Sequence, residues 1–149
     1  MERTLLKELP GMAGKDVLLR GWVHKIKEFK DFAFVVLRDR TGVVQLVVED
    51  LKAAGDLKLE AAVEINGVAV INPKAPGGIE VKVKNIELVG KTYYDLLPFQ
   101  INQRKIEASL EVQLNNRTIS LRRPDRRGIF KMQEEIVEAF RTYLKIPLL

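Results

Sequence analysis

The sequence has no cysteine and only one histidine, His24. The lack of cysteine excludes a disulfide framework, a thiolate metal site and a cysteine nucleophile. A single histidine argues against a histidine-based metal centre and against a serine–histidine triad. No apolar run approaches the ~20 residues that span a bilayer, and the polar, charged start is unlike a signal peptide. We therefore expect a cytoplasmic protein that has no membrane partner.

The charge balance of the 149 residues is basic, with a formal net charge of +5. An apolar content of 46% is enough for a real core, and 30% charged residues are typical of a soluble globular chain. A basic chain suits a polyanionic partner, because Lys and Arg side chains that neutralise phosphates release counterions. A globular domain that is merely basic fits the same charge.

Five short segments alternate apolar and polar residues, which predicts strands at 17–26, 32–39, 43–48, 61–71 and 79–88. Residues 49–59 suit a short helix between the third and fourth strands. The two prolines of residues 72–78 place that segment in a loop. Five strands with a helix at this point predict an OB-fold, an all-β Greek-key barrel that binds oligonucleotides and oligosaccharides.

The register of the second and third strands follows from a turn signal at residues 39–42, Asp-Arg-Thr-Gly. With this turn, residue 38 pairs with 43, 36 with 45 and 34 with 47. Phe34 and Gln45 then lie on the same non-core face as diagonal neighbours, roughly 7–8 Å apart. A slip of one residue would put them on opposite faces.

Three side chains on the predicted outer face suit contact with nucleotides. Phe34 offers a base a stacking surface, and the amide of Gln45 can both donate to and accept from a base edge. The Glu80 carboxylate accepts from exocyclic amines and ring N–H groups. The phosphates would meet nearby lysines, namely Lys25, Lys27 and Lys30.

Each of these residues also has a purely structural interpretation. Phe34 fits a small satellite hydrophobic cluster, Gln45 fits a solvated strand position, and Glu80 could pair with Lys82. Spacing alone does not decide between the two interpretations. Two other polar residues, His24 on the first strand and Asp39 in the turn, are expected to be solvated.

After residue 90 the composition changes. Residues 91–128 have few strand signals and many polar or basic residues, which predicts a connector. From Ile129 the apolar residues recur at helical spacing, with Asp125 as a candidate N-cap. We therefore divide the chain into an OB domain at 1–90, a connector at 91–128 and an amphipathic helix at 129–149, whose apolar stripe needs a partner surface.

Two stretches together resemble the N-terminal anticodon-binding domain of aspartyl-tRNA synthetases, in the archaeal-type form that includes enzymes able to charge the asparagine tRNA. They are Gly-Trp-Val at 21–23 with Phe-Val-Val-Leu-Arg-Asp-Arg-Thr-Gly-Val-Val-Gln at 34–45, and Ala-Pro-Gly-Gly-Ile-Glu-Val at 75–81. Asn-Arg at 116–117 with Leu-Arg-Arg-Pro at 121–124 resembles the connector of that family into its class II catalytic domain. Residues 129–144 resemble the first class II motif, which takes part in dimerisation.

The resemblance implies a role for each site residue. Phe34 would stack on the middle anticodon base, a uridine, and Gln45 would read that base or its neighbour. Glu80 would contact the first base, a guanosine. Lys27 stands where bacterial relatives carry an arginine, and with Lys25 it completes the expected RNA-binding set. The implied partner is tRNA(Asp), with tRNA(Asn) as a second candidate, and a homodimer would form through residues 129–144.

The second and third class II motifs, which hold ATP and the adenylate, are absent from these 149 residues. We therefore expect a fragment or truncated form with no catalytic residue, no metal site and no cofactor of its own. ATP and Mg²⁺ would serve only a full-length enzyme. The alternatives are the corresponding domain of an asparaginyl-tRNA synthetase, a generic single-strand-binding OB module, and a catalytic ligase completed by further sequence.

Overall fold

The structure is a computed structural model that describes residues 2–50, 52, 57–90, 97–103 and 105–145. The chain divides into two compact units, Met1–Asp95 and Leu96–Leu149. The boundary lies five residues beyond the predicted end of the OB domain. Each unit is described by itself.

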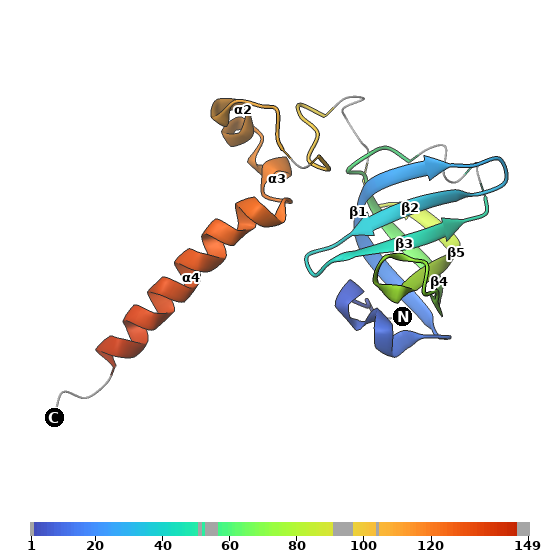
Figure 1. The fold of residues 1–149 in the computed structure, drawn as a ribbon, viewed down its shortest axis with the longest axis horizontal. Coiled ribbons are helices and arrows are strands. Elements are labelled where there is room, and N and C mark those ends of the chain that lie inside the picture. The colour runs from blue at the N-terminus through green and yellow to red at the C-terminus, as the bar shows by residue number, and fades with distance from the viewer. Residues whose placement is uncertain (1, 51, 53–56, 91–96, 104, 146–149) are drawn as a thin grey trace. The chain divides into compact units, whose positions relative to one another are not determined.

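The first unit is a closed barrel of five strands (Figure 1). The strands are β1 (Asp16–Glu28), β2 (Ala33–Arg38), β3 (Val43–Val48), β4 (Ala62–Ile71) and β5 (Ile79–Leu88). Their order around the barrel is β1-β2-β3-β5-β4, and only β3 and β5 pair in parallel. The all-β OB-fold barrel is thereby confirmed. The predicted helix at 49–59 falls largely outside the described residues.

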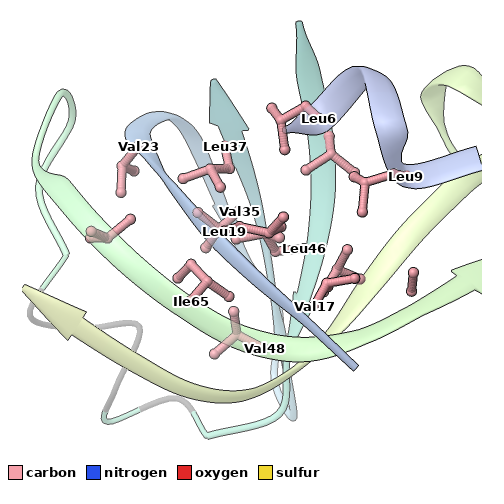
Figure 2. Packing of buried hydrophobic residues seen from close by; sticks show 14 of the residues in the cluster. Leu6, Leu9, Val17, Leu19, Val23, Val35, Leu37, Leu46, Val48 and Ile65 are labelled. Atoms are coloured by element: carbon pink, nitrogen blue, oxygen red, sulfur yellow. The ribbon is translucent and has the colours of Figure 1, made fainter. Parts of the chain in front are cut away.

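The register between β2 and β3 is the predicted one. Arg38 pairs with Val43, Val36 with Gln45, and Phe34 with Val47. The alternate side chains of these strands point inward and are fully buried (Figure 2). Because every core position on β2 and β3 is apolar, burial fixes this register against a one-residue slip.

Two glycines let strands of the barrel approach each other closely. A Cβ on Gly21 would lie 2.5 Å from the carbonyl oxygen of Arg38, and a Cβ on Gly67 would collide with the carbonyl of Lys82. A glycine in mid-strand suits a sharp bend, and Gly21 allows β1 to cross close to β2. The pairing between β1 and β2 also shifts register between Val23 and Lys25, as is typical of a strand that curves around a barrel.

A short 3-10 helix, η1 (Leu6–Met12), adds Leu6 and Leu9 to the buried core (Figure 2). The Pro10-Gly11 pair, which would signal a helix end, lies inside η1 instead. The backbone N–H of Leu6 donates to Asp39 Oδ2 at 3.1 Å. This bond attaches η1 to the β2–β3 turn.

The second unit contains α2 (Leu110–Asn115), α3 (Arg117–Ser120) and α4 (Pro124–Leu144). The segment predicted as a plain connector therefore holds two short helices. The long helix begins five residues earlier than Ile129, because Pro124 occupies its first turn, where a missing N–H costs nothing. Asp125 is consequently inside the helix and is not its N-cap, a position that Arg123 takes.

Among the described helices, none is both long and apolar enough to cross a bilayer.

Candidate nucleic-acid interface

The outer face of the barrel carries two parallel rows of side chains across β1, β2, β3 and β5. Strand pairing places directly paired residues on the same face. One row joins Lys27 to Phe34, Val47 and Lys82, and the next row joins Lys25 to Val36, Gln45 and Glu80. All five residues predicted for the RNA site therefore share one face of one sheet.

Glu80 is held by two amides at the end of the second row. Gln45 Nε2 donates to Glu80 Oε2 at 3.3 Å, and Asn72 Nδ2 donates to the same oxygen at 2.9 Å. Within the described residues, the other oxygen, Oε1, accepts no hydrogen bond. The carboxylate is thus fixed in place through Oε2, whereas the acceptor capacity of Oε1 is open.

Glu80 is not the partner of Lys82 that its structural interpretation suggested. It points to the outer face, yet it is only 8% exposed, since neighbouring side chains cover it. Its partners are Gln45 and Asn72 rather than Lys82. No sequence signal pointed to Asn72. It lies in the β4–β5 loop, and it contacts Glu80 because this loop folds back toward the start of β5.

Phe34 belongs to a cluster of three aromatic rings with Phe29 and Phe32. The Phe29 and Phe32 rings stack at 4.8 Å between centroids. Phe34 meets both of them edge-on, at 5.4 Å and 5.0 Å between centroids. None of the three belongs to the core cluster, so the interpretation of Phe34 as a satellite hydrophobic residue is correct as far as packing goes. Phe34 is half-buried, so part of it is exposed on the outer face of the sheet.

Lysines border the aromatic cluster. Lys27 Nζ lies 5.0 Å from the centroid of the Phe29 ring, and its backbone pairs with Phe34. Lys25, Lys30 and Lys82 are exposed. A face with aromatic rings, a carboxylate with an open oxygen, and exposed cations can stack bases, read a base edge and neutralise phosphates.

A buried ion pair lies near the end of β2 and was not predicted. Arg38 Nη2 donates to Glu60 Oε2 at 2.6 Å, and the two side chains are 7% and 4% exposed. The alternation places Arg38 on the outer face, where a charge is usually solvated. Glu60, just before β4, covers it, and no local pattern in the sequence links residues 22 positions apart.

His24 packs against this ion pair. Arg38 Nη1 lies 3.1 Å from His24 Nδ1, and because arginine can only donate, Nδ1 is the acceptor of a neutral ring. Burial and the nearby Arg38 charge lower the pKa of His24 below 6.5, more than Glu60 raises it. The expectation of a solvated strand residue is therefore wrong for His24.

Asp39 organises the β2–β3 turn. Its Oδ1 accepts from the backbone N–H and the hydroxyl of Thr41 and from the N–H of Gly42. Burial alone would raise the pKa of Asp39, but these bonds and the one from Leu6 outweigh it and lower the pKa below 3.8. Asp39 is buried and is not the solvated turn charge that we expected, because η1 closes over it.

In the described part of the chain, no three metal-ligating side chains come together.

Comparison with known proteins agrees with this geometry. Residues 17–89 match the family of OB-fold nucleic acid binding domains that bind tRNA anticodons. The barrel formed by these residues is a tRNA anticodon-binding OB domain.

The particular homologues are tRNA ligases. The chain is 34% identical over 145 residues to the aspartate–tRNA(Asp/Asn) ligase of Methanopyrus kandleri, covering 91% of this chain and 33% of that protein. It is 35% identical over 145 residues to the ligase of the same name from Deinococcus radiodurans, covering 97% and 32%. A crystal structure of asparaginyl-tRNA synthetase from Pyrococcus horikoshii superimposes with a TM-score of 0.81 at 30% identity, covering 96% of this chain and 35% of that one.

The anticodon-binding domain is thus homologous to that of the aspartate/asparagine tRNA ligases. The chain spans about a third of the length of these relatives.

Proposed function

We propose that the barrel binds the anticodon loop of a tRNA and reads its first two bases. The observation that carries this proposal is the row in which Gln45 and Glu80 stand side by side, next to the row that contains Phe34. Specific recognition of RNA favours unstacked loop bases that can lie on an aromatic ring while their edges are read. An anticodon loop presents such bases.

In this proposal, Phe34 stacks on the middle base, a uridine, and Gln45 reads that base or its neighbour. The open Oε1 of Glu80 accepts from the N–H groups of the first base, a guanosine. Lys25 and Lys27 contact the phosphates. tRNA(Asp) is the proposed partner, and tRNA(Asn) shares the first two bases, so these residues do not separate the two.

The test uses the anticodon stem-loop of tRNA(Asp) and its single-base variants at one fixed salt concentration. Phe34→Ala should weaken binding by roughly 1–3 kcal/mol, because the base loses its stacking partner. Phe140→Ala removes an exposed ring from α4, outside the barrel, and serves as the matched control. Unchanged binding by Phe34→Ala would refute the stacking role.

Base reading has its own measurement. Gln45→Ala should reduce the preference for a middle uridine more than it reduces the overall affinity, since only the edge contact is lost. An equal loss for all four middle bases would show that Gln45 does not read the base. Competition by unstructured RNA as effective as the stem-loop would favour the generic single-strand binder instead.

For the whole protein, we propose aspartate–tRNA ligation with ATP and Mg²⁺, a reaction for which these residues supply the tRNA-binding domain. The support is the similarity to the two ligases over most of this chain. In this proposal the 149-residue polypeptide binds tRNA and does not catalyse the reaction. Aspartate-dependent pyrophosphate exchange by this polypeptide would contradict it.

We further propose that residues 129–144 form a homodimer contact. The large apolar side chains on α4 are all at least 46% exposed, among them Met132, Phe140 and Tyr143. Burying such a stripe against a second copy would remove it from water. Light scattering should show a dimer, and Phe140→Glu should convert it to a monomer. A monomeric wild-type chain would contradict this contact.

A further inference from the structure

Asn72 is the residue of the β4–β5 loop whose side-chain amide reaches Glu80. It is half-buried, and all four of its polar groups form hydrogen bonds. Its backbone N–H donates to Gly78 O at 3.0 Å, and its backbone carbonyl accepts from Ala75 N–H at 2.9 Å. Its Oδ1 accepts from Lys74 N–H at 3.0 Å, and its Nδ2 donates to Glu80 Oε2 at 2.9 Å. The loop therefore holds Asn72 in a single orientation.

Two glycines give the loop the path that brings Asn72 back to β5. Gly77 and Gly78 have φ angles of 79° and 75°, a region that residues with a Cβ rarely adopt. The carbonyl of Gly78 accepts the Asn72 N–H and so closes the loop. The contact between Asn72 and Glu80 is thus set by the backbone of residues 72–78.

The amides of Asn72 and Gln45, which both donate to Glu80, are not equivalent. An amide can turn end for end, so its polarity is fixed only when both of its ends have partners. In Asn72 the Lys74 N–H needs an acceptor, so Oδ1 faces Lys74 and the NH₂ group faces Glu80. Gln45 makes the longer bond, at 3.3 Å, and within the residues that the structure describes no second side-chain bond fixes its polarity. Asn72 therefore requires residue 80 to present an acceptor to the loop.

The bond from Asn72 restrains the Glu80 carboxylate. With Oε2 bonded to the loop, the acceptor capacity of Oε1 is open. Without this bond, the carboxylate is free to turn toward Lys82, an exposed cation two residues further along the same face of β5. Resting on the proposed function, in which Glu80 meets a base edge, we propose that Asn72 is a specificity-determining positioning residue. It does not contact the base, and it fixes which atom of residue 80 does.

A restrained carboxylate selects its ligand by the polarity of the edge that it meets. An ionised carboxylate only accepts hydrogen bonds, so Glu80 favours an edge that presents N–H donors over one that presents acceptors. A side chain that is already fixed also loses little conformational freedom when the ligand binds. Loss of the Asn72 bond should therefore reduce the preference among bases, measured as a ratio of dissociation constants, more than it disturbs the barrel.

The test reverses the polarity of this contact. Glu80→Gln keeps the shape of the side chain, and the NH₂ group of Asn72 then obliges the amide to turn its oxygen inward and its own NH₂ group outward. Asn72→Asp keeps the acceptor for the Lys74 N–H and replaces the donor by a second acceptor. In the double variant Asn72→Asp/Glu80→Gln, the amide at position 80 must turn its NH₂ group inward, which returns an acceptor to the outer side.

Binding is measured with the full 149-residue chain at one salt concentration. The RNAs are anticodon stem-loops of tRNA(Asp) in which each anticodon base is replaced in turn. The base at which Glu80→Gln loses the wild-type preference is the base that residue 80 meets, so the test assumes no order of the bases. Thermal melting of each variant checks that the barrel is folded.

At that base, Asn72→Ala and Asn72→Asp should each reduce the preference by about five-fold or more, the lower end of what a contact to a base edge discriminates. The double variant should regain about five-fold over Glu80→Gln, a rescue that a merely structural role of Asn72 would not produce. Asn85→Ala is the matched control, because Asn85 Nδ2 also donates to a carboxylate of its own strand, Glu87 Oε1 at 3.0 Å. It should keep the wild-type preference.

Three results would overturn the role of Asn72 while leaving the proposed function intact. The first is a wild-type preference in Asn72→Ala beside a lost preference in Glu80→Gln. The second is an Asn72→Ala variant that loses affinity equally for all the RNAs. The third is a double variant with no more preference than Glu80→Gln. Failure of the proposed function looks different: Glu80→Gln would keep the wild-type preference at every base, and the role of Asn72 would fall with it.

Discussion

Glu80→Gln should remove discrimination at the first anticodon base without unfolding the barrel. The substitution keeps the size of the side chain and replaces the negative carboxylate by a neutral amide. The carboxylate offers two acceptor oxygens, of which Oε2 is engaged by Gln45 and Asn72. In the amide, one of those two oxygens becomes an NH₂ group, so either the internal bonds or the contact to a guanine N–H must be lost.

The size of the effect follows from these contacts. A well-placed contact to a base edge discriminates against the wrong base by ~1–3 kcal/mol, which corresponds to about 5- to 150-fold in affinity. Hydrogen bonds to a charged acceptor stabilise a protein by about 1.5–3 kcal/mol and neutral ones by about 0.5–1.5 kcal/mol. The loss of charge at the 8% exposed Glu80 should therefore lower the free energy of unfolding by ~1–2 kcal/mol, which leaves a folded barrel.

The assay is fluorescence anisotropy with stem-loops that carry guanosine, adenosine or cytidine at the first position, at one salt concentration. Wild type should prefer guanosine, and Glu80→Gln should bind the three RNAs nearly alike. Glu87→Gln alters an exposed carboxylate on the same strand and is the matched control. If Glu80→Gln keeps its preference for guanosine, or loses affinity equally for all three, Glu80 does not read this base.

Three further predictions concern the stability of the barrel. Glu60→Ala should lower the free energy of unfolding by about 3–5 kcal/mol in urea, because it removes the carboxylate that balances the buried charge of Arg38. Arg38→Met in the same chain should restore much of the loss, and a persistent deficit would contradict this explanation. The lowered pKa of Asp39 means that its stabilisation is present above pH 3.8 and disappears as the pH falls through its folded pKa. The difference in unfolding free energy between wild type and Asp39→Asn should accordingly shrink at acid pH, and a constant difference would refute the linkage. Gly67→Ala should destabilise by ~1–3 kcal/mol in the same assay, since its Cβ has no space beside Lys82, whereas Gly11→Ala, with nothing within 4 Å, should not.

The local architecture of the barrel was predictable from the sequence. Alternation of apolar residues assigned each strand and its inward face, and the Asp39–Gly42 turn determined the pairing of Phe34 with Val47. These features depend on neighbours in sequence, and the period of two in a strand makes them visible. The predicted start of α4 was wrong by five residues, because the first turn, from Pro124 to Gly128, carries no apolar periodicity.

The sequence predicted which residues belong to the candidate site, but it did not predict the contacts between them. Spacing and the family resemblance selected Phe34, Gln45 and Glu80. Nothing local indicated that Asn72 would share Glu80, or that Phe29 and Phe32 would surround Phe34. Loop conformations bring these side chains in, and loops carry no hydrophobic period.

The sequence by itself determined the strand order along the chain, the buried face of each strand and the chemical groups available on the outer face. Only the tertiary structure decided which of those groups meet. Closure of the barrel through the parallel β3–β5 pair sets Glu80 beside Gln45, although 35 residues separate them. The helix η1 folds over the β2–β3 turn and buries Asp39. The segment that leads into β4 places Glu60 against Arg38. The physical reason is that non-local pairing depends on the burial of the whole core, which no single segment encodes.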